Sequence, residues 1–360
     1  MELLYKNDWS KTQERFNAFW EKELVDRPIV QVLARKKGVK QIINWTGWEL
    51  LHNKDNIEEV VSKFETYCKQ TYFGGDEFPN LWINLGAGIM AAYLCSNPII
   101  GEDTVWFETQ TDWSILDTLE FNPKNNWWQL TKYLTDTVTE LSNNKFFVGI
   151  TDLGGILDTV AAIRGSQNLL FDLIDNPDKV KRLSSKITGI WIKCYQELYE
   201  IINKKMVGSS AWMGLWSPKK WYPIQCDFSA MISPKMFKEF VVPDLIQQCR
   251  YLDHSIYHLD GPTALVHLDT LLDITELDGI QWEPGAGNPG TGSQKWIPIY
   301  KRIQKSNKLL VLRWIDKEDI DNLINELSPK GLVLHFKPCD KEEEVEELIK
   351  RIERWVIEKG

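Results

Sequence analysis

Short apolar runs alternate with longer amphipathic segments, most regularly in the second half of the chain. The runs at 279–283, 309–312 and 332–336 are each followed by a segment in which apolar residues recur every three or four positions. A short run that is apolar throughout is typical of a strand buried on both faces, and the recurrent spacing is typical of a helix with one buried face. This alternation predicts a parallel sheet covered by helices. The predicted strands cover residues 28–34, 146–150, 209–213, 224–226, 255–258, 279–283, 309–312 and 332–336, and the predicted helices cover 9–24, 55–72, 125–141, a segment from about 155, 176–202, 233–251, 263–272, 296–305, 317–327 and 341–358.

The number and spacing of the strands favour a closed barrel. About eight strand-like runs in 360 residues fit a (β/α)8 TIM barrel, and no GxGxxG motif follows the first run. No linker or break in composition divides the chain, so we expect one domain over 1–360, with an N-terminal extension and the first strand in 1–54. We expect the helix at 9–24 to pack as a lid or base. The irregular, glycine- and proline-punctuated region 73–123 predicts long loops over one barrel face.

The composition is that of a large globular protein. Hydrophobic residues make up 43% and charged residues 26% of the chain, which suits a large core and excludes a mainly disordered chain. The net charge of −9, with no basic stripe, argues against nucleic acid as a partner. Neither a signal pattern nor a membrane-length apolar run is present, so we expect no membrane association and a cytoplasmic location. The six cysteines form no CxxC pair, which is typical of free thiols in a reducing compartment.

The run at 255–262 ends in groups that can bind a ligand. His258 and Asp260 alternate with Leu259, so both side chains point to the same side of an extended strand. In a barrel, the carboxyl ends of all strands face one mouth, so polar residues there become neighbours although they are far apart in the sequence. The polar or reactive residues near predicted strand ends are Thr151, Asp152, Cys226, Asp227, His258, Asp260, Trp282, Glu283, Arg313 and Cys339.

A histidine, thiolates and carboxylates that converge in this way predict a zinc site. The best set takes His258 and Cys339 as ligands and completes it with Glu283, Asp260 or Cys226. With only three protein ligands, a position would remain open for a substrate thiol, whose pKa the cation would lower. The alternative is structural, because a strand-end histidine beside an acid can be a hydrogen-bonded pair and Cys339 can be a loop thiol.

Two further strand-end acids and one arginine are candidates for the site. Asp152 precedes a Leu-Gly-Gly turn that opens a helix, where it would either cap the helix or border an anion site, and the cap is the simpler interpretation. Together with Asp227 and Asp260 it forms the candidate catalytic set. Arg164 ends that helix and would either clamp a substrate carboxylate or merely suit the helix dipole.

Seventeen tryptophans are present, and several stand in loop-like contexts. Trp45, Trp48, Trp212 and Trp282 are candidates for substrate binding, as an aromatic cage for a cation, a sugar or a flat cofactor. The alternative is that these large side chains only fill space in the core.

The segment CDFSAMISPKMFKEF at 226–240, followed by YHLDGP at 257–262, resembles the uroporphyrinogen decarboxylase superfamily, whose members carry an ISPxxFxEF helix start and then a strand that ends near a histidine and a glycine. The resemblance covers roughly the C-terminal two-thirds of the chain. It is closest to the corrinoid methyltransferase-like branch, labelled trimethylamine corrinoid protein 2-like, through WMGLW, QCDFSAMISP, YHLDGP and the IQW and PGAG pieces at 280–287.

This resemblance implies a (β/α)8 barrel and, for the methyltransferase members, zinc held by a His-x-Cys pair and a later cysteine. Such enzymes move a methyl group from a corrinoid protein to a thiol such as coenzyme M, or to folate in other systems. His258 and Cys339 match the first and last positions, whereas Asp260 stands where relatives carry cysteine. Glu283 could imitate the glutamate that a more distant barrel relative adds. The segment 26–35 lacks the arginine-rich pattern of true decarboxylases, which argues against porphyrinogen decarboxylation.

The leading interpretation is a zinc-dependent methyltransferase-like enzyme that takes its methyl group from a corrinoid protein, the expected partner, and passes it to a small thiol or similar acceptor. A second hypothesis is a metal-free decarboxylase or lyase that uses Asp152 and Asp227. A third is a barrel that binds a small molecule between its tryptophans without turnover.

Overall fold

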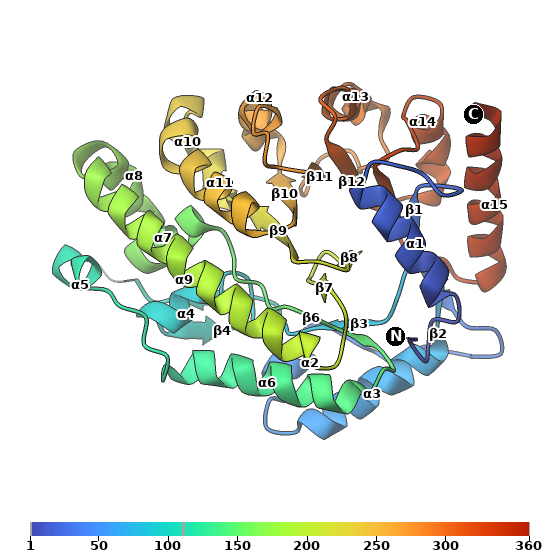
Figure 1. Ribbon diagram of the computed structural model, residues 1–360, viewed down its shortest axis with the longest axis horizontal. Helices are drawn as coiled ribbons and strands as arrows, with labels where there is room; N and C mark the ends of the chain where they lie inside the picture. The colour runs from blue at the N-terminus through green and yellow to red at the C-terminus, as the bar shows by residue number, and fades with distance from the viewer. Residues whose placement is uncertain (1, 110–111, 360) are drawn as a thin grey trace.

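The computed structural model describes residues 2–109 and 112–359, in which helices surround a central, mainly parallel sheet (Figure 1). The sheet has seven strands in the order β2-β1-β13-β12-β11-β10-β9, and every neighbouring pair is parallel except β1 and β2. Strands β1, β9, β10, β11, β12 and β13 occupy six of the predicted positions. The bounds are β1 Ile29–Arg35, β2 Thr71–Gly75, β9 Trp221–Gln225, β10 His254–Asp260, β11 Gly279–Glu283, β12 Leu309–Ile315 and β13 Leu332–Phe336.

A second, two-stranded parallel sheet pairs β3 (Asn80–Trp82) with β6 (Phe147–Gly149). Next to it, the N–H of Ile150 donates to the carbonyl of Ser210 at 2.8 Å. Ser210 belongs to β7 (Ser209–Ser210), which pairs with β8 (Trp216–Ser217), and the N–H of Trp221 in β9 donates to the hydroxyl of Ser209 at 2.9 Å. The last two predicted strands therefore exist as β6 and the short β7.

The arrangement is consistent with a TIM-like barrel, but the strand pairings of the described residues form separate sheets instead of one closed ring. The reason lies at the edge of β1. The predicted barrel needs that edge for the next parallel strand, and β2 occupies it as an antiparallel partner, with Arg35 opposite Thr71 and Gln31 opposite Gly75. Strands β2 and β3 and the hairpin of β4 (Pro98–Ile100) and β5 (Val105–Phe107) lie in the region expected to be irregular.

The helices present one apolar face to the sheet and one polar face to solvent, as their spacing predicts. The helix predicted at 233–251 is two helices that meet at Val241, because Pro243 has no N–H to continue the helical hydrogen bonds and opens the second helix instead. The α-helices are α1 Trp9–Trp20, α2 Glu49–His52, α3 Ile57–Gln70, α4 Met90–Leu94, α5 Trp113–Asp117, α6 Asn126–Ser142, α7 Ile156–Arg164, α8 Ser166–Asp175, α9 Pro177–Asn203, α10 Pro234–Phe240, α11 Val242–Tyr251, α12 Leu268–Leu272, α13 Ile297–Lys305, α14 Ile320–Ile324 and α15 Glu342–Lys359, and the short 3-10 helices are η1 Asp227–Met231, η2 Pro262–His267, η3 Gln294–Trp296 and η4 Lys317–Asp319.

Helix α1 closes the end of the sheet at which the strands begin. The Trp20 ring stacks on His254, the first residue of β10, with ring centroids 4.6 Å apart, and the Trp20 indole N–H donates to the carbonyl of Trp216 at 2.9 Å. Trp9 packs edge-on against the Trp216 ring. The helix is therefore a base, one of the two expected positions, and the carboxyl ends of the strands lie at the opposite end of the sheet.

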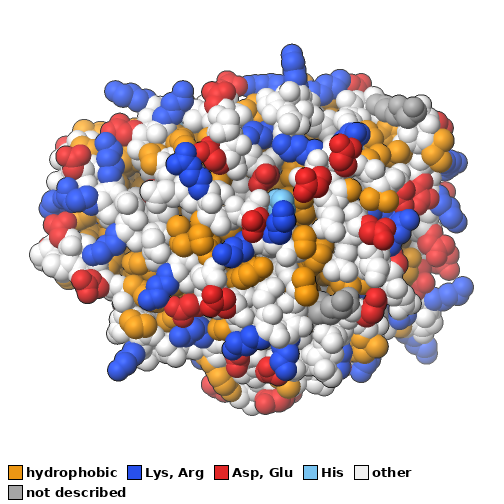
Figure 2. All heavy atoms as spheres, viewed as in Figure 1, with side chains coloured by type: hydrophobic (Ala, Val, Ile, Leu, Met, Phe, Trp, Pro, Cys, Tyr) orange, Lys and Arg blue, Asp and Glu red, His pale blue; other side chains and the backbone are white. Residues whose placement is uncertain are grey.

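Acidic and basic side chains are interspersed over the face of the molecule shown in Figure 2. Within the described part of the chain, no helix combines the length and the apolar character needed to cross a membrane.

Candidate functional site

Three side chains that can bind a metal come together at the carboxyl ends of β9 and β10. One ligand atom each from Asp227, His258 and Asp260 lies within 4.8 Å of the others. His258 and Asp260 alternate along β10, and His258 is in register with Gln225 of β9, so Asp227, two residues further on, comes beside Asp260. We call these three residues the strand-end triad.

Gln281 holds the imidazole of His258 in one orientation. The amide N–H of Gln281 donates to the carbonyl of Trp282 at 2.9 Å, so the amide oxygen faces Nδ1 of His258 and bonds to it. An oxygen acceptor at Nδ1 places the ring proton there and leaves the lone pair of Nε2 free. Burial lowers the pKa of His258, so the ring is neutral at physiological pH. This is the state in which histidine binds a metal.

Carboxyl groups are crowded around the triad. Burial is the main cause that raises the pKa of Asp227 to about 7, and the nearby Asp260 and Asp152 raise it further. The pKa values of Asp152 and Asp158 are also raised to about 7, again mainly by burial. Like charges in an enclosed site raise the cost of ionisation, which a bound cation would reduce.

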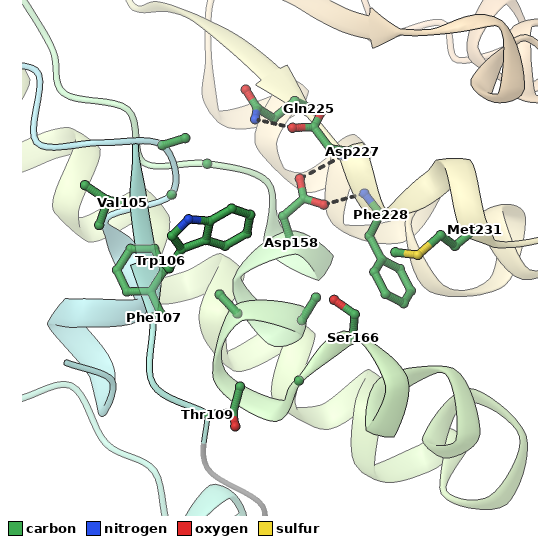
Figure 3. Close-up of a pocket in the computed structure, with 16 residues that line it drawn as sticks. Val105, Trp106, Phe107, Thr109, Asp158, Ser166, Gln225, Asp227, Phe228 and Met231 are labelled. Atoms are coloured by element: carbon green, nitrogen blue, oxygen red, sulfur yellow. Dashed lines mark hydrogen bonds between the residues drawn. The ribbon is translucent and has the colours of Figure 1, made fainter. Parts of the chain in front are cut away.

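Asp158 positions the turn that carries Asp227. Its two carboxylate oxygens accept hydrogen bonds from the backbone N–H groups of Asp227 at 3.0 Å and Phe228 at 2.7 Å (Figure 3). These bonds attach the first turn of α7 to η1. Sequence reasoning missed this residue, although an acid in the first turn of the helix after Gly154 and Gly155 was a usable signal.

Asp152 stabilises the turn before α7. Its carboxylate accepts from the N–H of Gly154 at 2.8 Å, and the side chain is buried. A Cβ on Gly155 would lie 2.3 Å from the carbonyl oxygen of Gln225, so only glycine allows α7 to begin this close to the end of β9. The bond to Gly154 closes a turn, and the N-cap of α7 is Gly155 without a side-chain cap, so Asp152 does not cap the helix.

The three other predicted metal ligands lie outside the triad. Cys226 is buried, and burial raises its pKa well above the usual value, with Asp158 as the nearest acid to contribute. Cys339 bonds through its N–H to the carbonyl of Leu33 at 2.8 Å, and burial raises the pKa of its thiol. Glu283 is in register with Asp260 on the neighbouring strand. The triad therefore offers nitrogen and oxygen donors and no sulfur.

One of the four candidate tryptophans lies against the triad. The ring of Trp212 packs edge-on against the His258 ring, with centroids 5.3 Å apart. Trp282 is buried against Trp296, and Trp45 packs on Phe64 of α3.

The fourth candidate tryptophan and the candidate arginine have structural neighbours of their own. Trp48 precedes α2 and its ring lies 6.4 Å from that of His52. Arg164 forms an ion pair with Asp172 at 2.6 Å and lies over the Trp113 ring. The roles of both residues in substrate binding stay predictions.

A cavity of about 440 Å³ lies beside the triad and has Asp227 and Asp158 in its lining. Trp106 and Phe107 from the β4–β5 hairpin form one side, and Phe228 and Met231 form the opposite side, with Asp158 between them (Figure 3). The walls are mainly apolar, and carboxyl groups stand toward the triad. A small molecule in this cavity could therefore reach the triad through Asp227.

Comparisons with known proteins show what the fold is similar to. The sequence matches no protein-family model and no curated protein. Among solved structures, a methyltransferase from Methanosarcina mazei superposes with a TM-score of 0.62, covering 96% of this chain and 99% of that chain at 11% sequence identity. The two proteins share a fold. At this identity, the likeness extends to the arrangement of helices and strands and not to individual residues.

Proposed function

We propose that this protein is a zinc-dependent methyltransferase-like enzyme that moves a methyl group from a corrinoid protein to a thiol or a similar small acceptor. The observation that carries the proposal is the strand-end triad, in which one ligand atom each of Asp227, His258 and Asp260 lies within 4.8 Å of the others. The fold shared with a methyltransferase and the sequence motifs around 226–262 support the reaction class.

The residues of the triad fit a zinc ion. Zinc accepts histidine nitrogen together with carboxylate oxygen, and three protein ligands leave a position open for a substrate. Because Asp260 replaces the cysteine of the relatives and both cysteine candidates lie elsewhere, this donor set is harder than a thiolate set and suits manganese or iron as well. When bound, the cation would lower the pKa of a thiol acceptor and hold it as the thiolate nucleophile.

Residues of this chain orient the metal ligands and surround the acceptor. Gln281 fixes the imidazole through Nδ1 and so leaves Nε2 free to bind a metal, and Asp158 fixes the turn that presents Asp227. The apolar side chains of the cavity would contact the small acceptor beside Asp227. In the net reaction the acceptor sulfur gains the methyl group, the donor cobalt–carbon bond breaks with both electrons left on cobalt, and the thiol proton is released.

The test measures methyl transfer by the zinc-loaded protein. Methylcobalamin is the donor, a panel of small thiols provides the acceptors, and the change in cobalamin absorbance is the readout. We expect methyl transfer that a chelator abolishes and added zinc restores. His258→Ala should lower the rate at least 100-fold, whereas His52→Ala, which removes an exposed histidine of α2, should not change it. Transfer that is insensitive to chelator and to His258→Ala would contradict the proposal.

One observation favours a second candidate, a metal-free decarboxylase or lyase. The pKa values of Asp152, Asp158 and Asp227 are all raised to about 7, so these carboxyls can donate a proton near neutral pH. Turnover that survives a chelator and is lost in Asp227→Asn would favour this candidate over methyl transfer.

A further inference from the structure

Arg313 is a cation at the carboxyl end of β12 whose side chain is held on three sides. Its Nε–H donates to Nδ1 of His335 at 3.4 Å. Its guanidinium carbon lies 5.6 Å from the ring centre of Trp212 and 5.3 Å from that of Trp314. Burial, together with the Arg313 charge, lowers the pKa of His335 to about 3, so that ring is neutral and can accept the hydrogen bond.

The charge of Arg313 has no close counter-ion. Within the described ranges, no carboxylate forms an ion pair with it inside 4.0 Å, and its terminal nitrogens make no hydrogen bond. Burial lowers the pKa of Arg313 to about 10, so the guanidinium still carries its charge at neutral pH. Arg313 is half-buried, so water can satisfy these N–H groups, and an anion that replaces the water would gain charge-assisted hydrogen bonds.

The nearby acids do not take this role. Glu77 and Glu283 are the acidic groups that influence Arg313. Burial raises the pKa of Glu77 to about 7, so that group is only partly ionised at neutral pH. One of its oxygens lies 3.8 Å from Nε2 of His335 and has no hydrogen-bond partner. Among the described residues, neither Glu77 nor Glu283 forms an ion pair with Arg313 within 4.0 Å, so both act on its charge only from a distance.

Trp212 places Arg313 near the triad. The same indole ring lies 5.3 Å from the His258 ring and 5.6 Å from the guanidinium carbon of Arg313. His258 of the triad and the guanidinium are therefore neighbours of the same side chain. An acceptor that extends from the triad past this ring would meet a cation.

We propose that Arg313 binds the carboxylate of the small methyl acceptor and so selects an acidic acceptor over a neutral or cationic one. The planar guanidinium matches the two oxygens of a carboxylate in a bidentate pair. Binding at Arg313 leaves the other end of the acceptor at the triad. This inference rests on the proposed function, because it names the acceptor class for the same site.

The test compares 3-mercaptopropionate with 3-mercapto-1-propanol, which has the same length and no charge, by calorimetric titration of the zinc-loaded protein. We expect the wild type to bind the acid at least tenfold more tightly than the alcohol. In Arg313→Gln the two affinities should become equal while that for the alcohol changes less than twofold. Arg313→Lys, which keeps the charge and loses the planar fork, should retain an intermediate preference.

Arg302→Gln is the matched control, because Arg302 is an exposed arginine on α13, and it should leave the preference unchanged. No preference in the wild type, no binding of either thiol, or an unchanged preference in both Arg313 variants would overturn the inference. Binding is measured without methyl transfer, so the two proposals fail separately. A preference that depends on Arg313 without any transfer contradicts the proposed function, and transfer without a preference contradicts the role of Arg313.

Discussion

At the scale of single residues, the site depends on which nitrogen of His258 carries the proton. Gln281 decides this, because its amide oxygen faces Nδ1. Gln281→Leu removes the acceptor and leaves the ring free to rotate or change tautomer. We expect zinc affinity to fall roughly 10- to 100-fold, as for other partners of metal-binding histidines. Competition with a chromophoric chelator measures this, with the exposed Gln129→Leu as the control, and equal affinities in both variants would show that Gln281 has no positioning role.

A second residue-scale prediction concerns pH. Asp244 of α11 is buried and accepts from the hydroxyl of Thr188 at 2.9 Å, and burial raises its pKa to about 6 from an ordinary value of 3.8. The folded state therefore binds more protons than the unfolded state between about pH 4 and 6, and stability falls as the pH rises through that window. Asp244→Asn keeps the acceptor and removes the charge.

The difference in the free energy of unfolding between Asp244→Asn and wild type should therefore grow in favour of the variant from about pH 4 to 6. Above pH 7 it should stay constant at roughly 1–3 kcal/mol. Urea unfolding at a series of pH values measures this. Asp136→Asn, at an exposed position of α6, should show no such trend. A difference between Asp244→Asn and wild type that does not vary with pH would contradict the assignment.

Residue patterns predicted part of the site. Strand alternation was enough to place His258 and Asp260 together, because the period of a strand does not depend on the rest of the fold. The position of Cys339 could not be predicted in this way, because it follows from the path of the loop after β13, which bonds to Leu33 of β1. Gln281 reaches His258 because β11 pairs in register with β10, and Asp158 reaches Asp227 because α7 begins close to the end of β9. A single sequence specifies neither the register of two strands nor the approach of a helix to a strand.

At the scale of elements, the start of α7 against the end of β9 sets the geometry of η1. Gly155→Ala would place a Cβ 2.3 Å from the carbonyl oxygen of Gln225 and equally close to the Asp158 carboxylate. We expect a loss of roughly 1–3 kcal/mol in the free energy of unfolding. Thermal and urea unfolding measure this loss.

Gly189→Ala is the matched control in the middle of α9, where an added Cβ would meet nothing within 4 Å. It should be neutral or stabilise the protein by about 0.5–1 kcal/mol, since alanine favours the helix. Equal effects of the two substitutions would contradict the close approach of α7 to β9.

Elements with long apolar runs were the predictable ones. All eight predicted strands exist, although the strand predicted at 209–213 is reduced to β7. Strand β2 was missed because it begins in the last two residues of the predicted helix 55–72 and ends at a pair of glycines, and β3 was missed because it has only three residues. Because β2 pairs antiparallel with β1, this omission also explains why a closed ring was expected.

At the scale of the whole molecule, Asp76 joins the N-terminal base to the central sheet. This buried carboxylate accepts from Arg15 of α1 at 3.1 Å, from Arg27, and from the N–H of Val30 in β1 at 2.9 Å. Asp76→Ala would leave the buried Arg27 without its carboxylate partner and would remove one of the two carboxylates of Arg15, which keeps its ion pair with Asp26 at 2.7 Å. We expect a loss of roughly 3–5 kcal/mol in the free energy of unfolding.

The control is Asp136→Asn, which breaks an exposed ion pair between Asp136 and Lys204 and should cost less than about 1 kcal/mol. Urea unfolding compares the two. A similar small effect at Asp76 would show that α1 is held by its aromatic contacts alone.

The central claim is that Asp227, His258 and Asp260 together hold one zinc ion. The most direct measurement is a calorimetric zinc titration of chelator-treated protein, with wild type, His258→Ala, Asp260→Asn and the control His52→Ala measured side by side. We predict one ion per chain for wild type and the control, and affinity at least 100-fold weaker in both triad variants. Zinc binding that is absent from the wild type, or unchanged in both triad variants, would contradict it.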